Sequence, residues 1–131
     1  MEKNFKIEII SPEKLIFSGQ VNMATLPSYE GDMSILKDHI SIITFLGPGK
    51  ITVEKNEGNY EKFFVEDGTV EFFSNNLVVL SSSAKNVKDL SKDYLNKLEK
   101  NTTDQLSKKD ITDRERYILN HKIDALKEIR L

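Results

Sequence analysis

The sequence of 131 residues contains no cysteine and no tryptophan. Without cysteine, a disulfide scaffold, a thiolate metal site and a cysteine nucleophile are all excluded. No segment approaches the roughly 18 consecutive apolar residues that a membrane-spanning helix needs. Charged residues interrupt the first 20 positions, so these do not resemble a signal peptide. We therefore expect a cytoplasmic protein that does not insert into a membrane.

Glycine and proline, which break helices, and phenylalanine are confined to the first part of the chain. All six glycines, all three prolines and all seven phenylalanines precede residue 75, whereas the arginines follow residue 113. Lysine, arginine, aspartate and glutamate give residues 1–85 a net charge of −4 and residues 86–131 a net charge of +2. Neither value indicates a nucleic-acid-binding protein, which usually has a strongly basic face. The distribution predicts two differently built domains, 1–85 and 86–131.

Short alternating segments predict β-strands in the first domain. Residues 5–9 alternate apolar and polar side chains, and similar runs follow at intervals of about 8–12 residues. Turn sequences separate them, at 18–20, 56–59 and 66–68, where the Asp-Gly pair suits positive φ. Residues 27–39 have no strand pattern and are interpreted as a loop rich in exposed side chains. About eight or nine such strands, with no helix of two turns, favour an antiparallel sandwich or barrel.

Helical periodicity begins after residue 83. Apolar side chains from Val87 to Leu98 predict a first helix over about residues 88–100, which ends within residues 101–104. Thr112 and Glu115 match a capping box, and a second apolar arc follows from there to the C-terminus.

A polar loop of about ten residues would join these helices into an antiparallel hairpin. Each helix is close to the length at which isolated helices are marginal in water. The hairpin must therefore pack on the strand domain or on a partner, and the sequence leaves both positions open.

Few residues are suited to catalysis or metal binding. His39 follows Asp38 in a polar loop without any nucleophile motif, so we expect it to make a backbone hydrogen bond or a protein contact. His121 lies at the edge of an apolar arc, as a packing residue would. Glu30 and Asp32 complete a local acidic group that lacks the spacing of a calcium loop. Glycine motifs that bind phosphate are also missing. We expect no catalytic residue, no cofactor and no metal.

Three segments in a fixed order carry a family resemblance. Residues 17–21 read Phe-Ser-Gly-Gln-Val, residues 30–39 run from Glu-Gly to His, and residues 47–51 read Gly-Pro-Gly-Lys-Ile. Their order, spacing and the total length resemble the epsilon subunit of the bacterial F-type ATP synthase, and the match in motif order spans residues 5–84. The resemblance implies an α+β fold, in which a ten-stranded antiparallel β-sandwich precedes a C-terminal antiparallel two-helix hairpin.

The resemblance also implies partners. It implies a non-catalytic subunit of the central stalk, peripheral to the cytoplasmic face of the cell inner membrane, which couples proton-driven rotation to ATP synthesis. In the family, an acidic turn lies near the polar loops of the c-ring and a histidine loop faces the gamma subunit. Carried over to this chain, the c-ring contacts are Glu30, Gly31 and Asp32, and the gamma contacts are His39 and Ser41.

The family's hairpin lies folded against the sandwich or extends along gamma, where it restrains ATP hydrolysis. We hypothesise that basic residues of an extended hairpin reach acidic segments of the catalytic alpha and beta subunits, namely Arg114, Arg116, Lys122, Lys127 and Arg130. Some family members bind ATP on the hairpin through an Ile/Leu-Asp-x-x-Arg-Ala motif. Residues 90–95 read Leu-Ser-Lys-Asp-Tyr-Leu here, without the motif's carboxylate and guanidinium, so no nucleotide binding is predicted.

An alternative is a free-standing β-sandwich module that binds carbohydrate or peptide. Such a module would present a row of exposed aromatic side chains. The chain has no tryptophan, and its phenylalanines mostly fall on strand positions that suggest a core. An enzyme is the third alternative, disfavoured by the lack of a catalytic set.

Overall fold

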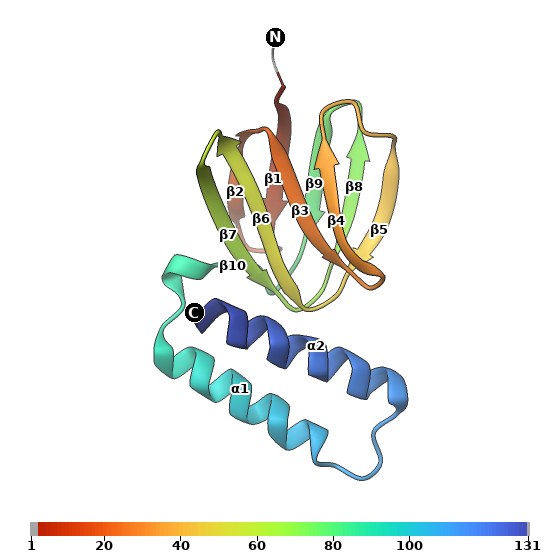
Figure 1. Ribbon diagram of the computed structural model, residues 1–131, viewed down its shortest axis with the longest axis vertical. Coiled ribbons are helices and arrows are strands. Elements are labelled where there is room, and N and C mark those ends of the chain that lie inside the picture. Colours follow the sequence, from red (N-terminus) through yellow and green to blue (C-terminus); the bar gives the residue numbers. More distant parts are fainter. Residues whose placement is uncertain (1–2, 131) are drawn as a thin grey trace.

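The computed structural model describes residues 3–130, with the backbone alone for Arg130. Within this part of the chain, ten strands precede a short 3-10 helix and two α-helices (Figure 1). The elements are β1 (Phe5–Ile10), β2 (Leu15–Val21), β3 (Met23–Ser28), β4 (Gly31–Leu36), β5 (Ile42–Leu46), β6 (Gly49–Asn56), β7 (Asn59–Val65), β8 (Gly68–Phe73), β9 (Asn76–Leu80), β10 (Lys85–Asn86), η1 (Val87–Asp89), α1 (Lys92–Leu106) and α2 (Asp113–Arg130).

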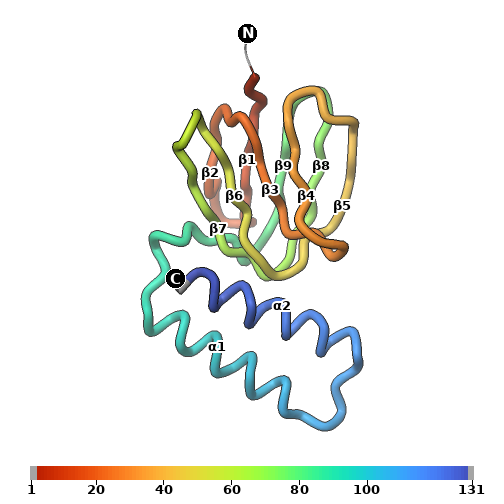
Figure 2. Tube along the Cα trace, in the orientation of Figure 1, coloured from red at the N-terminus to blue at the C-terminus, as the bar shows by residue number. Residues whose placement is uncertain are grey.

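The strands form two facing layers that enclose the main core (Figures 1 and 2). They pair in the order β10-β7-β6-β3-β5-β8-β9-β1-β2, and β4 pairs with β3 outside this path. Among the described pairs, β1 with β9 is the parallel one, and the others are antiparallel. The predicted antiparallel sandwich is therefore confirmed except at this pair, which could not be foreseen because alternation of side chains does not report strand direction.

Alternating apolar residues of the strands fill the space between the layers. Phe5, Ile7 and Ile9 of β1 are buried, whereas Lys6 between them points outward and is exposed. The ring of Phe5 meets the ring of Phe72 edge-on, with centroids 5.6 Å apart. Burial of such side chains is the dominant stabilising term of a sandwich of this size.

Two strand predictions fail. Residues 18–20 were expected to turn, but β2 continues through them because Gly19 pairs opposite Ile7 of β1. The expected loop 27–39 contains β4, which pairs with β3 over its whole length. In β4 only Ile35 is fully buried and Met33 is partly buried against the core, so the alternation is short and the sequence analysis missed it. This strand and the short β10 raise the number to the ten that the family resemblance implied.

Gly58 and Gly68 require glycine for different reasons, one for its backbone conformation and the other for lack of space. Gly58 has a φ of 78° at the tip between β6 and β7, which confirms the turn predicted at residues 56–59. Gly68 was expected to need positive φ, and it does not have it. Gly68 is instead constrained by space, because an added Cβ would lie 2.8 Å from the carbonyl oxygen of Leu80.

The first α-helix begins and ends later than the sequence indicated. Residues 87–89 form η1, and the Ser91 hydroxyl caps α1 by accepting from the Tyr94 amide at 3.0 Å. The helix continues to Leu106, and the Thr102 hydroxyl donates to the Leu98 carbonyl at 2.7 Å inside it. The connection is consequently residues 107–112, shorter than the ten expected.

The capping prediction for the second helix is confirmed for Thr112, whereas the Glu115 carboxylate accepts from the Thr112 hydroxyl in place of the expected backbone amide. The Thr112 hydroxyl accepts a hydrogen bond from the Glu115 amide at 3.1 Å and also donates to the Glu115 carboxylate. Helix α2 begins at Asp113, directly after this residue.

The hairpin is folded against one end of the sandwich. Helix α2 lies between the strands and α1, and both helices cross below the strand ends (Figure 1). Ala125 and Leu126 of α2 and Leu95 of α1 share a buried cluster with Phe64 of β7. Of the two positions that the sequence left open, the structure shows the docked one. No described helix is long and apolar enough to cross a membrane.

Candidate functional site

The acidic residues predicted to meet the c-ring lie together on the turn between β3 and β4. Ser28 pairs with Gly31, and Tyr29 and Glu30 occupy the tip between them. The Ser28 hydroxyl donates to the Gly31 carbonyl, and Gly31 has a φ of 122°, which favours glycine. Glu30, Gly31 and Asp32 are all exposed. The turn therefore presents two carboxylates to solvent at the end of the sandwich beside the hairpin (Figure 1).

The histidine segment lies at the opposite end of β4, where the chain passes to β5 (Figure 1). Asp38 has a φ of 67°, and its backbone amide and carboxylate both bond to the Asn75 side chain, at 2.7 and 3.0 Å. Nδ1 of His39 lies 2.7 Å from the Ile40 carbonyl, and its ring meets Phe72 edge-on. The predicted backbone hydrogen bond is confirmed. Ser41 follows as an exposed residue.

The outer surface of strands β5, β8 and β9 carries four large exposed apolar side chains, with Thr69 and Glu71 of β8 between them. Ile43 and Phe45 of β5 project from it with 77% and 63% of their surfaces exposed. Leu80 of β9 lies on the same face, since Phe45 pairs opposite Thr69 and Thr69 opposite Leu80. Phe73 lies on the Thr69 side of β8, four residues further along the strand, and is also exposed. We call this surface the outer face, defined by Ile43, Phe45, Phe73 and Leu80. Large exposed apolar patches of this kind usually mark interaction surfaces.

Sequence reasoning missed the outer face. Phe45 and Phe73 belong to the phenylalanines that strand patterns placed mostly in the core. The available signal was the uninterrupted pair Ile42-Ile43, in which one side chain turns inward and the other outward. Antiparallel strands commonly face the core on one side and solvent on the other, so apolar side chains on both sides of β5 depart from this pattern.

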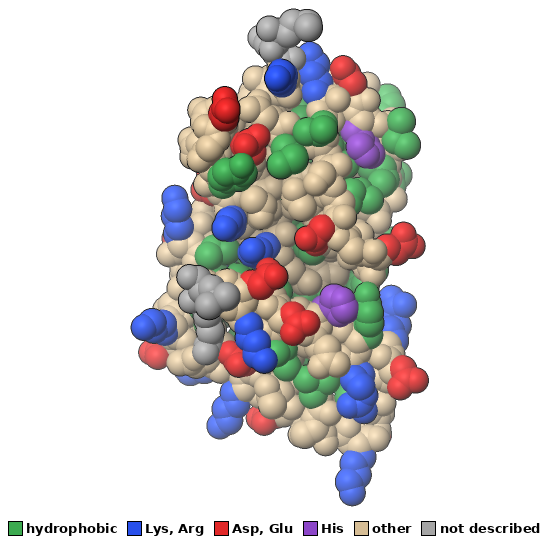
Figure 3. Space-filling model, in the orientation of Figure 1, with side chains coloured by type: hydrophobic (Ala, Val, Ile, Leu, Met, Phe, Trp, Pro, Cys, Tyr) green, Lys and Arg blue, Asp and Glu red, His purple; other side chains and the backbone are tan. Residues whose placement is uncertain are grey.

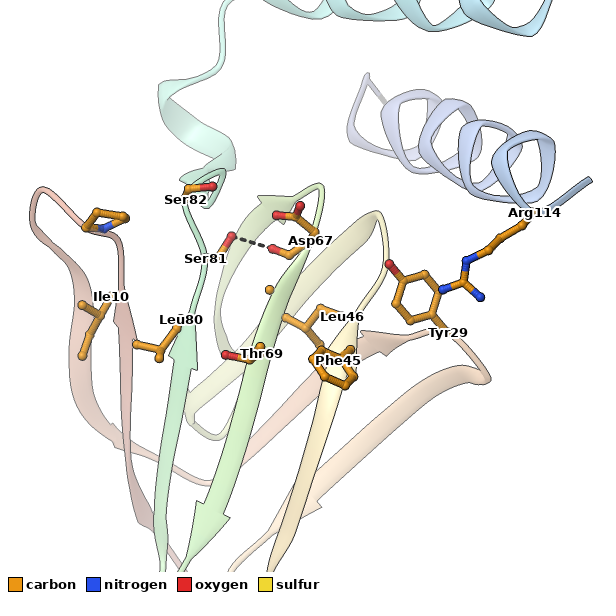
Figure 4. A pocket seen from close by; sticks show the side chains of 12 residues that line it. Ile10, Tyr29, Phe45, Leu46, Asp67, Thr69, Leu80, Ser81, Ser82 and Arg114 are labelled. Atoms are coloured by element: carbon orange, nitrogen blue, oxygen red, sulfur yellow. Dashed lines mark hydrogen bonds between the residues drawn. The ribbon is translucent and has the colours of Figure 1, made fainter. Parts of the chain in front are cut away.

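A groove of about 690 Å³ lies at the end of the outer face that is next to the hairpin (Figure 4). Its apolar lining includes Ile10, Phe45 and Leu80, and the aromatic ring of Tyr29 borders it. Arg114 of α2 extends toward Tyr29 from the other side, so sandwich and hairpin both contribute to this groove (Figure 4).

The basic residues assigned to the hairpin do not form one patch. The Arg114 guanidinium lies 5.5 Å from the centroid of the Tyr29 ring, and Lys122 pairs with Glu66 of the sandwich. Arg116 and Lys127 are exposed, and the side chain of Arg130 lies outside the described residues. Figure 3 shows basic and acidic side chains interspersed over the visible face of the hairpin.

The remaining candidates have structural roles. Among the described residues, no group of three or more His, Asp or Glu side chains is placed to hold a metal ion. The His121 ring stacks on Tyr117, with centroids 4.1 Å apart. In the segment that corresponds to the family's ATP motif, Ser91 caps α1 and Leu95 is buried in the cluster between the hairpin and β7.

Comparison with known proteins identifies the class. A model of the ATP synthase delta/epsilon chain β-sandwich domain matches residues 4–87. The fold also matches a chain of the Euglena gracilis mitochondrial ATP synthase, in a structure of OSCP, F1 and c-ring. That match has a TM-score of 0.80 at 16% identity and covers 100% of this chain and 84% of the other. A chain from the Tetrahymena thermophila mitochondrial ATP synthase central stalk and c-ring matches with a TM-score of 0.65 at 14% identity, with 96% of each covered. The fold is thus that of an ATP synthase delta/epsilon subunit.

Sequence relatives narrow this class. The chain is 46% identical over 130 residues to the ATP synthase epsilon chain of Pelagibacter ubique, with 98% of this chain and 99% of the relative covered. It is 34% identical over 134 residues to the epsilon chain of Parvibaculum lavamentivorans, with 99% and 98% covered. The chain belongs to the ATP synthase epsilon chain family, which confirms the resemblance found in the sequence.

Proposed function

We propose that the chain is a non-catalytic rotor subunit that binds gamma through the outer face and the c-ring through the turn that carries Glu30. It would transmit proton-driven rotation between them as a peripheral component at the cytoplasmic face of the cell inner membrane. The observation that carries the proposal is the exposure of Ile43 and Phe45 on the same outer side of β5.

The outer face suits a permanent protein partner. Burial of apolar surface contributes roughly 25 cal/mol per Å², and side chains as exposed as Ile43 and Phe45 gain it only when a partner covers them. His39 and Ser41 directly precede β5, so the predicted gamma contacts are continuous with this face. A single partner that lies along β5 would contact both.

The acidic turn suits a polar partner. Glu30 and Asp32 are exposed carboxylates at the hairpin end of the sandwich, away from His39 at the far end of β4. Exposed ion pairs contribute only about 0–1 kcal/mol each, so this contact would orient the rotor and add little affinity. Separate surfaces for the two partners fit a subunit that connects them.

Binding of matched variants to purified gamma tests the proposal. Ile43→Lys with Phe45→Lys should abolish gamma binding, because two cations would be buried in an apolar interface. Tyr60→Lys makes the same kind of change at an exposed position of β7, outside the outer face, and should bind as the unmodified chain does. Normal gamma binding by the double variant, or failure of the unmodified chain to assemble with gamma and the c-ring, would contradict the proposal.

We further propose the division of labour expected from sequence, in which residues 1–85 hold the rotor and residues 86–131 regulate it. The docked hairpin engages Arg114 and Lys122 with the sandwich, so a brake through the five basic residues requires release of the hairpin.

The cysteine-free chain allows a direct test of this regulation. Cysteines at Lys50 and Glu128, an ion pair of 3.4 Å across the junction, can be joined by a short bismaleimide to lock the hairpin. In the assembled complex the locked subunit should relieve inhibition of ATP hydrolysis, as should deletion of residues 86–131. Unchanged hydrolysis in both would show that the hairpin does not inhibit.

A further inference from the structure

Helix α2 makes two contacts with Tyr29, the residue that precedes Glu30 on the exposed turn. The Tyr117 hydroxyl donates to the Tyr29 carbonyl at 3.0 Å. The Arg114 guanidinium lies 5.5 Å from the centroid of the Tyr29 ring, in cation–π range. Arg114 and Tyr117 are three residues apart and therefore lie on one face of the helix. Backbone and side chain of one turn residue are thus both held by the hairpin.

Both ends of this contact are themselves supported. The Tyr29 ring packs on Gly47, where an added Cβ would lie 3.3 Å from two ring atoms. On the hairpin, the Tyr117 ring is stacked on His121, whose Nδ1 lies 2.9 Å from the Tyr117 carbonyl. Tyr29 is therefore held between the sandwich and α2, and its backbone leads directly into Glu30 at the tip.

We propose that Arg114 and Tyr117 are positioning residues for the acidic turn, so that docking of the hairpin and binding of the c-ring to Glu30 are coupled. This inference rests on the proposed c-ring contact. In the docked state, the two side chains hold the turn in the conformation that presents Glu30 and Asp32 together. Release of the hairpin removes both contacts and leaves the turn with the hydrogen bond of Ser28 to Gly31 and the packing of the Tyr29 ring on Gly47.

Such coupling is reciprocal. If a docked hairpin raises the affinity of the turn for the c-ring by some factor, the bound c-ring favours the docked hairpin by the same factor. Couplings between sites typically span about 5–150-fold, and two exposed contacts place this one near the lower end, at about tenfold. The coupling would make an assembled c-ring hold the hairpin away from the position in which it brakes hydrolysis.

The first experiment uses the full chain alone. Amide hydrogen exchange across residues 28–32 is compared between the unmodified protein and the double variant Arg114→Gln with Tyr117→Phe. We expect about tenfold faster exchange in the double variant, and Leu126→Ala, which loosens the hairpin at a distant contact, should give the same change. Tyr60→Phe removes an equivalent hydroxyl far from the hairpin and should change nothing. Unchanged exchange in the double variant would overturn the proposal.

The second experiment measures affinity in the reconstituted complex with gamma and the c-ring. The double variant should bind the c-ring about tenfold more weakly and gamma normally, a split that a general folding defect would not produce. Arg114→Lys should retain more affinity than Arg114→Gln because it keeps the cation. Faster exchange with unchanged c-ring affinity would overturn the coupling and leave the proposed function intact. Failure of the unmodified chain to bind the c-ring would refute the proposed contact itself, and the coupling with it.

Discussion

Phe64 of β7 and Leu126 of α2 are both completely buried and belong to one hydrophobic cluster, separate from the core of the sandwich. Neighbouring strand residues such as Phe63 belong to the sandwich core. Strand β7 thus supplies one phenylalanine to each core. The hairpin is docked through an apolar contact, and the ion pairs Lys122–Glu66 and Lys50–Glu128 surround it.

Shortening of Leu126 should release the hairpin. Leu126→Ala removes a fully buried side chain and should cost about 2–5 kcal/mol of docking free energy, as other buried Leu→Ala changes do. Urea unfolding followed by the helical circular dichroism signal measures this, with the strand signal retained to higher urea. Lys127→Ala on the exposed side of the same helix is the control and should change stability by less than about 0.5 kcal/mol. Equal stability of the two variants would contradict the docked arrangement.

Substitution by alanine should destabilise the protein at Gly68 but be tolerated at Gly19. Gly68→Ala places a methyl group 2.8 Å from the Leu80 carbonyl oxygen and should cost about 1–3 kcal/mol, because β8 and β9 must move apart. Gly19→Ala meets its nearest neighbour, the Phe17 ring, at an ordinary 3.6 Å and should be tolerated. Thermal unfolding of both variants measures the difference, and a stable Gly68→Ala protein would show that the strands are less tightly paired.

Removal of the α2 cap should weaken the hairpin at its free end. Thr112→Ala leaves the Glu115 amide without its partner and should cost about 1 kcal/mol. Thr103→Ala, at an exposed position within α1, replaces threonine with a better helix former and should not destabilise. Amide exchange at the start of α2 distinguishes the two. Equal protection in both variants would mean that the cap is not formed in solution.

Docking should weaken at alkaline pH. Burial, and next the negative charge of Glu66, raise the pKa of Tyr94 above its ordinary value of 10.0. The docked state therefore holds the phenol proton more tightly than the released state does. The stabilisation is fully present below pH 10.0 and is lost as the pH rises through the raised pKa.

The comparison with Tyr94→Phe isolates this residue, because other groups that titrate in the same range are common to both proteins. Docking free energy measured from neutral pH to about pH 12 should fall more steeply in the unmodified chain. Parallel curves would show that Tyr94 does not titrate with docking.

Much of the fold could be predicted from sequence because its local signals are strong. Alternation in β1 and the capping pair Thr112 and Glu115 each determine their structure through neighbouring residues alone. Failures occurred where strand pairing decides. Strand β4 has one buried side chain and exists because β3 pairs along it, and the parallel direction of β1 depends on β9, far along the chain.

The candidate site was predicted less completely. The acidic turn was found through a motif, whereas the outer face was missed because a phenylalanine on a strand is equally compatible with core and surface. Phe72 and Phe73 are adjacent and face opposite ways, so only the register of β8 assigns them. The contacts of Arg114 and Tyr117 with Tyr29 join residues too distant in sequence for any local pattern to indicate.

The position of β1 between β9 and β2 has a consequence for biosynthesis. While the chain is still being translated, β1 and β2 can pair as a hairpin as soon as both have left the ribosome. The other edge of β1 stays open until residues 76–80 emerge, since β9 completes it. A ribosome that stalls before this point would carry a nascent chain with an unpaired, apolar strand edge, the kind of surface on which chaperones act.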